Sequence, residues 1–144
     1  MRVRDILGAK GAGVTTVEPA ATVAEAANVL AERNFGAVVV ADAAGGLAGI
    51  VSERDIVRRL ANDGADVLGR AVADIMTANI HTCGLDDTLD DLLGRMTERR
   101  IRHLPAVGEN GALVGMISIG DVVKRKIDLA AREAEDLKAY IAAG

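Results

Sequence analysis

One seven-residue pattern occurs twice in this chain and constrains its fold more than any other feature. Gly49 to Asp55 reads Gly-Ile-Val-Ser-Glu-Arg-Asp, and Gly115 to Asp121, 66 residues further on, reads Gly-Met-Ile-Ser-Ile-Gly-Asp. In each copy, two apolar residues precede a serine that is followed three positions later by an aspartate. That order is typical of a buried strand leading directly into a helix, with the serine as N-cap. The chain is therefore expected to contain two copies of one structural unit.

The similarity between the two copies extends well beyond this pattern. A shift of 66 residues aligns residues 14–60 with the later part of the chain without a gap, and it pairs Thr22 with Thr88. A chance match of this length at constant spacing is improbable, so we expect a tandem repeat. A short lead-in, residues 3–7, resembles residues 72–76, although the offset there is 69 residues.

Each copy predicts the same order of elements, β-α-β-β-α, and hence an α+β fold. A capping box formed by Thr22 and Glu25 begins a helix that Gly36 is expected to end. Pro105 within a strand predicts an edge strand or a bulge. The expected strands are residues 14–17, 37–41, 47–51, 80–83, 104–107 and 113–117, and the expected helices begin at residues 22, 52, 88 and 118.

The last part of the chain carries a different pattern. Apolar residues from Val123 to Ile141 are spaced alternately by four and three positions, as in the seam of a coiled coil. The segment spans only about two heptads, which is too short to be stable alone. It is interpreted either as a helix lying on its own domain or as a dimer contact. The predicted domains are residues 1–70 for the first copy with its lead-in, 71–127 for the second copy, and 128–144 for the C-terminal helix.

Composition argues against several classes of function. The net charge of −4 and the pI of about 5.2 argue against nucleic-acid binding, and two aromatic residues, Phe35 and Tyr140, are too few for a base-stacking platform. Cys83 is the single cysteine, so neither a disulfide framework nor a zinc motif is expected. No apolar run is long enough to span a bilayer, so we expect no membrane association and a cytoplasmic protein.

Two β-α-β-β-α units that each end in Gly-apolar-apolar-Ser-x-x-Asp resemble a tandem pair of cystathionine-β-synthase (CBS) domains, the Bateman module, here as a stand-alone protein. The stretch Arg102-His103-Leu104-Pro105-Ala106-Val107 is similar to the family's strand signature, in which Leu-Pro-x-Val follows basic residues. The resemblance covers about residues 1–127. It implies two units packed sheet to sheet about a pseudo-twofold axis, clefts that bind adenine nucleotides, and homodimers.

The resemblance assigns roles to both copies of the pattern. Asp55 and Asp121 accept hydrogen bonds from ribose hydroxyls, and Ser52 and Ser118 bond ribose or phosphate. From the residues alone, the serine and aspartate form a helix cap, because the serine accepts from a first-turn N–H and the aspartate favours the positive end of the helix. Free N–H groups at that end also suit an anion, so capping and binding are compatible.

Basic residues are expected to make the two sites unequal. By the resemblance, Arg102 and His103 reach the phosphate of the nucleotide at Asp55, and Arg54 joins them as a planar fork. The site at Asp121 has uncharged residues at the corresponding positions, namely Gly36, Ala37 and Gly120. We therefore expect a phosphate-rich site at Asp55 and a roomier, less charged site at Asp121 that suits a nucleoside or NAD(H).

Adenine recognition is expected from backbone groups of the first strands, near Thr16 and Thr82, with the side chains of Ile50 and Met116 against the ring. Thr16 and Thr82 are equally well interpreted as ordinary strand residues. Pro105, in the strand signature, completes the candidate ligand-binding residues. No combination of residues indicates a catalytic or metal site.

The leading hypothesis is a non-catalytic module for signal transduction or energy sensing. It binds AMP, ATP or NAD(H), and an unidentified protein partner reads the ligand state. One alternative is a structural dimerisation module with non-functional sites, since both serines also cap helices. Another is a nucleotide hydrolase that uses Asp55 with His103 as base, but a lysine-bearing phosphate loop is absent.

Overall fold

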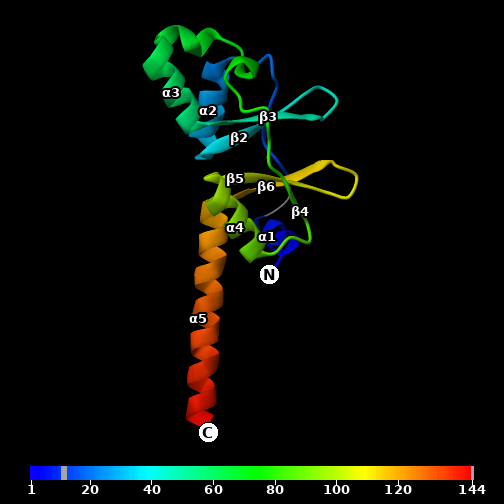
Figure 1. Ribbon diagram of the computed structural model, residues 1–144, viewed down its shortest axis with the longest axis vertical. Helices are drawn as coiled ribbons and strands as arrows, with labels where there is room; N and C mark the ends of the chain where they lie inside the picture. Colours follow the sequence, from blue (N-terminus) through cyan, green and yellow to red (C-terminus); the bar gives the residue numbers. More distant parts are fainter. Residues whose placement is uncertain (11–12, 144) are drawn as a thin grey trace.

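The computed structural model describes residues 1–10 and 13–143, which form two stacked α+β units (Figure 1). Each unit has a three-stranded sheet, ordered β1-β2-β3 or β4-β5-β6, in which the first two strands run parallel and the last two form an antiparallel hairpin. This arrangement confirms the predicted tandem repeat. The elements are α1 (Val3–Lys10), β1 (Thr16–Val17), α2 (Val23–Arg33), β2 (Ala37–Ala41), β3 (Leu47–Ser52), α3 (Glu53–Asp63), the 3₁₀ helices η1 (Ala65–Gly69) and η2 (Val72–Asp74), β4 (Cys83–Gly84), α4 (Leu89–Arg99), β5 (His103–Val107), β6 (Leu113–Ser118) and α5 (Ile119–Ala143).

Side-chain caps define the ends of the helices. Thr22, Ser52, Thr88 and Ser118 each accept a hydrogen bond from a first-turn N–H, and the acidic residue at the third helical position accepts one in return, which completes four capping boxes. Helices α2 and α4 both end at a residue in the left-handed region, Asn34 or Arg100, with φ of 55°. The expectation that Gly36 ends α2 is therefore wrong, because Asn34 supplies the left-handed cap two residues earlier.

The central strand of the second sheet contains a proline, and its neighbour β4 has the same length as β1 but begins one position later in the repeat. In the first unit Thr16 of β1 pairs with Val39 of β2, but their counterparts Thr82 and Pro105 do not pair. Proline has no N–H to donate, so β4 begins only at Cys83, and Pro105 has a paired strand on the β6 side alone. The register shift of this hairpin lies between Ala106 and Val107, one residue beyond Pro105, and the first hairpin has the equivalent shift without a proline. The proline therefore does not account for the bulge, and its strand is central in the sheet, not at the edge.

Each hydrophobic core includes a lead-in from the other side of the predicted domain boundary. Val3 of α1 is fully buried in the second core, whereas Val72 of η2 is fully buried in the first. The Val3 N–H donates to Asp87 O at 2.9 Å, and the Val72 N–H donates to Ala21 O at 2.7 Å. The exchange is reciprocal, as an approximate twofold relation between the units requires. The boundary predicted at residue 70 therefore does not separate the cores, because each core is completed by the opposite lead-in.

The glycine of each repeated pattern makes room for one of these lead-ins. A Cβ on Gly49 would lie 2.6 Å from Met76 Sδ and 2.9 Å from the backbone oxygen of Thr77. At Gly115 the nearest atoms all belong to the side chain of Leu7. The glycine in each pattern therefore allows the lead-in to lie directly against the strand.

Helix α5 runs without interruption from Ile119 to Ala143 and projects away from both units (Figure 1). Its first turns pack on the second core and on α4, where Lys126 Nζ lies 2.7 Å from Asp90 Oδ1. Residues 131–143 are all exposed, so this part of the helix does not lie on its own domain. The boundary predicted at residue 128 falls inside the helix. Among the described residues, no helix is both long and apolar enough to cross a membrane.

Candidate functional site

The two strand–helix junctions share one internal geometry. At the end of β3, Asp55 Oδ2 accepts the N–H of Ser52 at 2.9 Å, and the Asp55 N–H donates to Ser52 Oγ at 3.1 Å. At the end of β6, Asp121 and Ser118 form both bonds with the same lengths. In each junction the carboxylate oxygen Oδ1 accepts no hydrogen bond from the described residues. That oxygen can accept a hydrogen bond from another group, although neither aspartate is among the residues that line the two pockets described below.

Lys10, at the end of α1, makes the second junction different. Its Nζ donates to Asp121 Oδ2 and to Met116 O, both at 2.8 Å. Burial, the largest single influence, raises the pKa of Asp121, but the hydrogen bond and charge of Lys10 and the hydrogen bonds of Ser118 outweigh it and hold the pKa below its usual range. Within residues 1–10 and 13–143, Asp55 forms no ion pair.

A cavity of about 620 Å³ lies beside the second junction. It is enclosed by the end of α1, the segment before β1, the start of β2 and the middle of β6, so both units contribute to its walls. A ligand in this cavity would contact both repeats at once. The lining residues are Leu7, Lys10, Gly13, Val14, Thr15, Arg33, Asn34, Phe35, Gly36, Ala37, Val38, His103, Gly115, Met116 and Ser118.

His103 lines this cavity, which corrects the prediction that it serves the site at Asp55. The hairpin register explains its position, because His103 pairs directly with Ser118 and their side chains point to the same side of the sheet. The imidazole also contacts the start of β2, since a Cβ on Gly36 would lie 3.3 Å from the ring. His103 therefore belongs to the second junction, in its own repeat.

The charge of the second site also differs from the prediction. Three basic side chains line the cavity, those of Lys10, Arg33 and His103. Burial is the main cause that lowers the pKa of His103, while the nearby Asp121 opposes the decrease and Lys10 adds to it. The expectation of a less charged site is wrong, because Lys10 arrives from the exchanged lead-in and Arg33 from the end of α2.

Three arginines line a second, shallower pocket of about 320 Å³. Arg54 comes from the start of α3 in the first unit, whereas Arg100 and Arg102 follow α4 in the second. Arg54 and Arg102, which are predicted to share one phosphate site, both line this pocket, whereas Asp55 is not among its lining residues. None of the three arginines forms an ion pair in the part of the chain that the structure describes. Because neighbouring guanidinium groups repel one another, a phosphate between them would be stabilising.

Comparison with known proteins assigns these features to a family. The model of the CBS domain matches residues 3–62 and 72–128, which is most of the chain. The chain belongs to the CBS-domain family. A CBS-domain-containing protein of Agrobacterium tumefaciens has a solved structure with a TM-score of 0.82 and 45% sequence identity, and the match covers 87% of this chain and 98% of that one.

Two further relatives of this CBS pair come from archaea. A protein of Acidianus ambivalens is 36% identical over 81% of this chain and 69% of its own length. A CBS-domain protein of Pyrobaculum aerophilum, solved in complex with AMP, has 30% identity and a TM-score of 0.75, and the match covers 84% of this chain and 89% of that one. The chain spans about two thirds of the length of the first three curated relatives, with values from 61% to 69%.

The remaining candidate residues of the CBS pair lie in different places. Met116 lines the cavity, and Thr15 rather than the exposed Thr16 does so from the segment before β1. Ile50, the counterpart of Met116, pairs through its backbone with the second lead-in. Pro105 is buried in β5 directly opposite Met116, so it shapes the strand behind the cavity wall.

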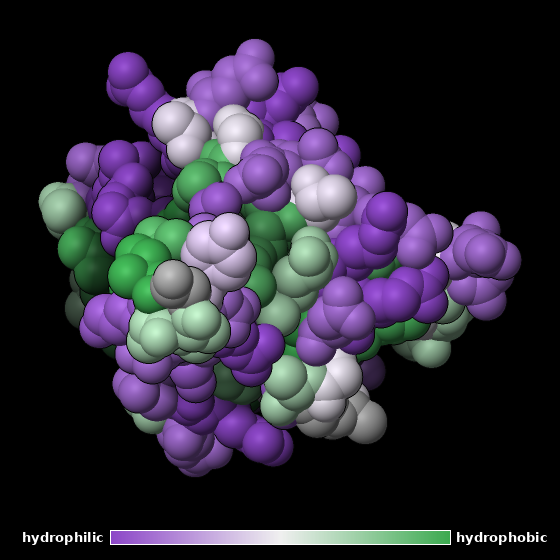
Figure 2. Space-filling view, turned by 90° about the horizontal axis from the view of Figure 1, so that it is seen from below, coloured by the Kyte–Doolittle hydropathy of each residue, from purple (hydrophilic) through white to green (hydrophobic). Residues whose placement is uncertain are grey.

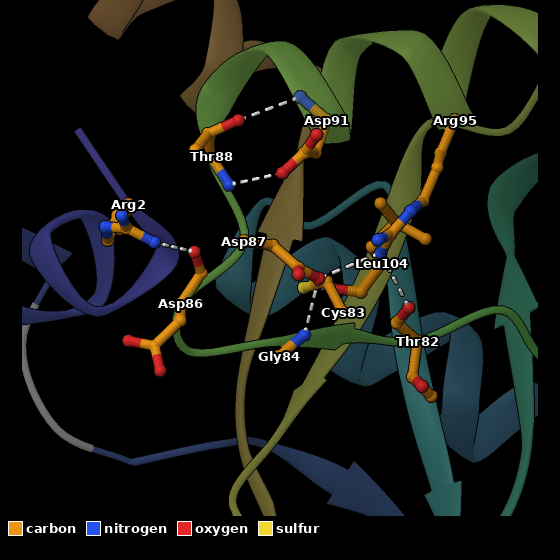
Figure 3. A network of polar contacts seen from close by, with 10 residues as sticks. All are labelled: Arg2, Thr82, Cys83, Gly84, Asp86, Asp87, Thr88, Asp91, Arg95 and Leu104. Atoms are coloured by element: carbon orange, nitrogen blue, oxygen red, sulfur yellow. Dashed lines mark hydrogen bonds and ion pairs between the residues drawn. The ribbon is translucent and has the colours of Figure 1, made fainter.

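Thr82 belongs to a network that holds the second CBS unit together rather than to the cavity (Figure 3). Its carbonyl oxygen accepts a hydrogen bond from Arg95 at 3.4 Å, and Arg95 also donates to Asp87 Oδ2 at 2.9 Å. The same carboxylate oxygen accepts the N–H of Gly84 at 2.8 Å. The network ties β4 to α4, which agrees with the interpretation of Thr82 as a structural residue.

Sequence reasoning missed Lys10 and Arg33. The sequence did contain a signal for Arg33. The repeat alignment placed Gly36 at the second site, and Arg33 lies only three residues before Gly36. Nothing in the sequence indicated that Lys10 reaches Asp121, since the exchange of lead-ins is a property of tertiary packing. Among the described residues, no group of three or more His, Cys, Asp or Glu side chains is arranged to hold a metal ion.

Proposed function

We propose that this CBS pair is a non-catalytic regulatory module that binds an adenine nucleotide at its strand–helix junctions. The observation that carries the proposal is the cavity of about 620 Å³ bordered by Ser118, whose partner Asp121 keeps one carboxylate oxygen available. Its volume lies within the range of small-molecule sites. The complex of the Pyrobaculum aerophilum relative with AMP supports the choice of ligand.

The polar groups around the cavity divide into two kinds that match a nucleotide. Asp121 offers an acceptor for ribose hydroxyls, whereas Lys10 and Arg33 offer positive charge for a phosphate. At the first junction, Asp55 likewise offers the acceptor, and the arginine pocket around Arg54 offers the positive charge. AMP is the ligand we favour for both junctions, and ATP and NAD(H) are the alternatives that a titration must separate.

Regulation follows from the position of the cavity between the two repeats. A ligand that contacts β2 and β6 together stabilises the arrangement in which these strands are close, and so shifts any equilibrium between closer and more open forms. A protein partner that binds one form more tightly would then read the ligand state. No reacting group is needed for this function.

The test is isothermal titration of AMP, ATP, NADH and adenosine into the full chain and three variants. Asp55→Asn and Asp121→Asn each reduce the acceptor capacity of one junction, so each is expected to weaken AMP binding by about tenfold or more at that site. Asp91→Asn is the matched control, because Asp91 has the same capping-box role at the start of α4, but its cap partner Thr88 lines neither pocket, whereas Ser118, the cap partner of Asp121, lines the cavity.

Micromolar binding of AMP that Asp121→Asn weakens and Asp91→Asn leaves unchanged supports the proposal. Absence of binding by the folded wild-type protein contradicts it and favours a structural dimerisation module whose serines and aspartates only cap helices. An equal effect of Asp91→Asn means that the loss arises from helix stability and also contradicts the proposed site. Turnover of any nucleotide would contradict the non-catalytic assignment.

A further inference from the structure

The free half of α5 leaves a row of large apolar side chains in water. Ile127 is 63% exposed, Leu137 is 59% exposed and Ile141 is 67% exposed, and residues 131–143 are all exposed. A helix of this length without tertiary contacts is only marginally stable in water. Viewed along α5 from its free end, the surface shows hydrophobic side chains gathered beside hydrophilic ones (Figure 2). Such a helix is stabilised if a partner covers its apolar side.

The apolar side chains form one continuous seam. Its six positions, spaced by four and three residues in turn, are Val123, Ile127, Ala130, Ala134, Leu137 and Ile141. The seam lies about a third of a turn around the helix from the face that packs on the second core, which is centred on the fully buried Val122. Packing within the chain therefore leaves the seam open along its whole length. The alanines at its centre allow two helices to approach closely.

We propose that the seam pairs with the same seam of a second copy of this chain in a parallel two-stranded coiled coil. The charges that flank the seam determine both the partner and the direction. In a parallel pair, Glu133 of each copy lies opposite Lys138 of the other, which gives two attractive contacts. The preceding flanking residue, Lys126, is already paired with Asp90 of its own chain, and its parallel neighbour is the uncharged Ala131.

An antiparallel pair has the opposite electrostatics. If the apolar positions overlap fully in that direction, Lys124 of each copy lies opposite Lys138 of the other, and Glu133 lies opposite the second Glu133. All of these contacts are repulsive. The same seam therefore favours the parallel direction through its flanking charges alone, and it places both CBS bodies at one end of the coiled coil.

Disulfide trapping in the full chain tests the direction. Leu137→Cys places two thiols face to face in a parallel pair, but opposite Ile127 in an antiparallel pair, so only the parallel arrangement gives a covalent dimer under mild oxidation. Arg132→Cys, on the outer side of the same helix, is the matched control. The native Cys83 is buried and is not expected to react. Absence of the Leu137→Cys dimer, or equal trapping of Arg132→Cys, overturns the proposal.

Sedimentation equilibrium of charge variants tests the partner contacts without altering the apolar seam. Lys138→Glu places two glutamates opposite each other in a parallel pair and is expected to weaken dimerisation by about tenfold, while Glu133→Lys combined with Lys138→Glu restores it. In an antiparallel pair, Lys138→Glu faces Lys124 and strengthens the dimer instead. A monomeric wild type, a dimer that Leu137→Glu leaves intact, or a dimer strengthened by Lys138→Glu each overturns the proposal.

Discussion

At the Ser52 junction and at the Ser118 junction the cap bonds have the same lengths, but only the aspartate of the Ser118 junction has a lysine in contact with it. The repeated residues thus reproduce the junction itself. The residues around each junction come instead from the lead-ins, which are not part of the 66-residue repeat. The charge of each site therefore depends more on the segment that packs against the junction than on the repeated residues.

The two lead-ins illustrate how this difference arises. The first remains helical as far as Lys10, which turns its amine toward Met116 O. The second leaves its 3₁₀ helix and becomes extended at Thr77, which exchanges two backbone hydrogen bonds with Ile50. One lead-in supplies a cation to its site, and the other supplies a short piece of β-structure. Two five-residue segments that share valine, aspartate and isoleucine at the same positions therefore complete their cores in different ways.

The largest expected effect is on stability and concerns the glycines that face the lead-ins. Gly49→Ala forces a methyl group against the Thr77 backbone oxygen, so we expect a loss of about 2–4 kcal/mol in the free energy of unfolding. Gly115→Ala meets only the flexible end of Leu7, and a loss of about 1–2 kcal/mol is expected. Urea unfolding measures both.

A double-mutant cycle separates the two glycines further. Leu7→Ala should relieve part of the loss caused by Gly115→Ala, because it removes the atoms in contact. Met76→Ala should not relieve Gly49→Ala to the same degree, because the backbone oxygen of Thr77 stays in place. If both Gly→Ala variants lose the same free energy of unfolding, and both double mutants recover the same part of it, the two lead-ins approach their strands in the same way.

The next effect is on ligand preference at the Asp121 site. Lys10→Met removes a positive charge from the cavity and one of the two hydrogen bonds to Asp121 Oδ2, so AMP should bind about fivefold more weakly while adenosine binds at least as well as before. The pKa of Asp121 should rise, because burial is then opposed only by Ser118. Calorimetry and an NMR titration of the carboxyl carbon measure the two results. An unchanged ratio of AMP to adenosine affinity contradicts this role for Lys10.

A smaller effect concerns pH and again distinguishes the two units, since the counterpart of His103 is Ala37. Burial lowers the pKa of His103, so the unfolded chain takes up the proton at a higher pH than the folded protein. Stability should be greatest above about pH 6.5 and decrease as the pH falls through the lower folded pKa. His103→Gln should show a shallower decrease in the free energy of unfolding between pH 7.5 and pH 5.5. Equal slopes for the two proteins would argue against a buried neutral imidazole.

The smallest effect is expected where the two units are most alike. Cys83 occupies the position of Val17, and both side chains are buried in their cores. Burial raises the pKa of Cys83 to about 12, with a further contribution from Asp87, so the native thiol should resist alkylation at neutral pH. Cys83→Val should change the free energy of unfolding by less than about 1 kcal/mol. Rapid labelling of native Cys83, or a larger loss, would show that the second core is packed more loosely at this point.

Local sequence signals predicted both hairpins and the starts of α2, α3, α4 and α5, because the relevant contacts lie within a few residues. They did not predict α1, and the strand expected at residues 80–83 forms only at Cys83–Gly84. The capping boxes at Thr22, Ser52 and Thr88 depend on bonds across three positions, and the hairpins depend on short turns. The position of His103 was also predictable in principle, since a hairpin that closes around Gly111 pairs residue 103 with Ser118. The assignment by resemblance overlooked this register.

The exchange of lead-ins could not be predicted from local pattern. Val3 and Val72 begin two similar apolar segments, and each core offers a similar hydrophobic face, so the sequence does not distinguish self-packing from exchange. The consequence for Lys10 follows directly, because its contact with Asp121 bridges 111 positions of the chain. The arrangement of the second site therefore depends on whether each lead-in packs on its own unit or on the other unit, and the sequence makes these two arrangements look nearly equivalent.

The exchanged lead-ins also impose an order on folding during synthesis. Helix α1 leaves the ribosome before the other elements, but the core that covers Val3 and Ile6 is complete only after Ile117 and Val122 have been made. The first core, in contrast, can close as soon as Ile75 has emerged. The apolar side of α1 therefore stays exposed while the elements from β1 to the start of α5 are translated, and α1 is the last of these elements to pack into a core.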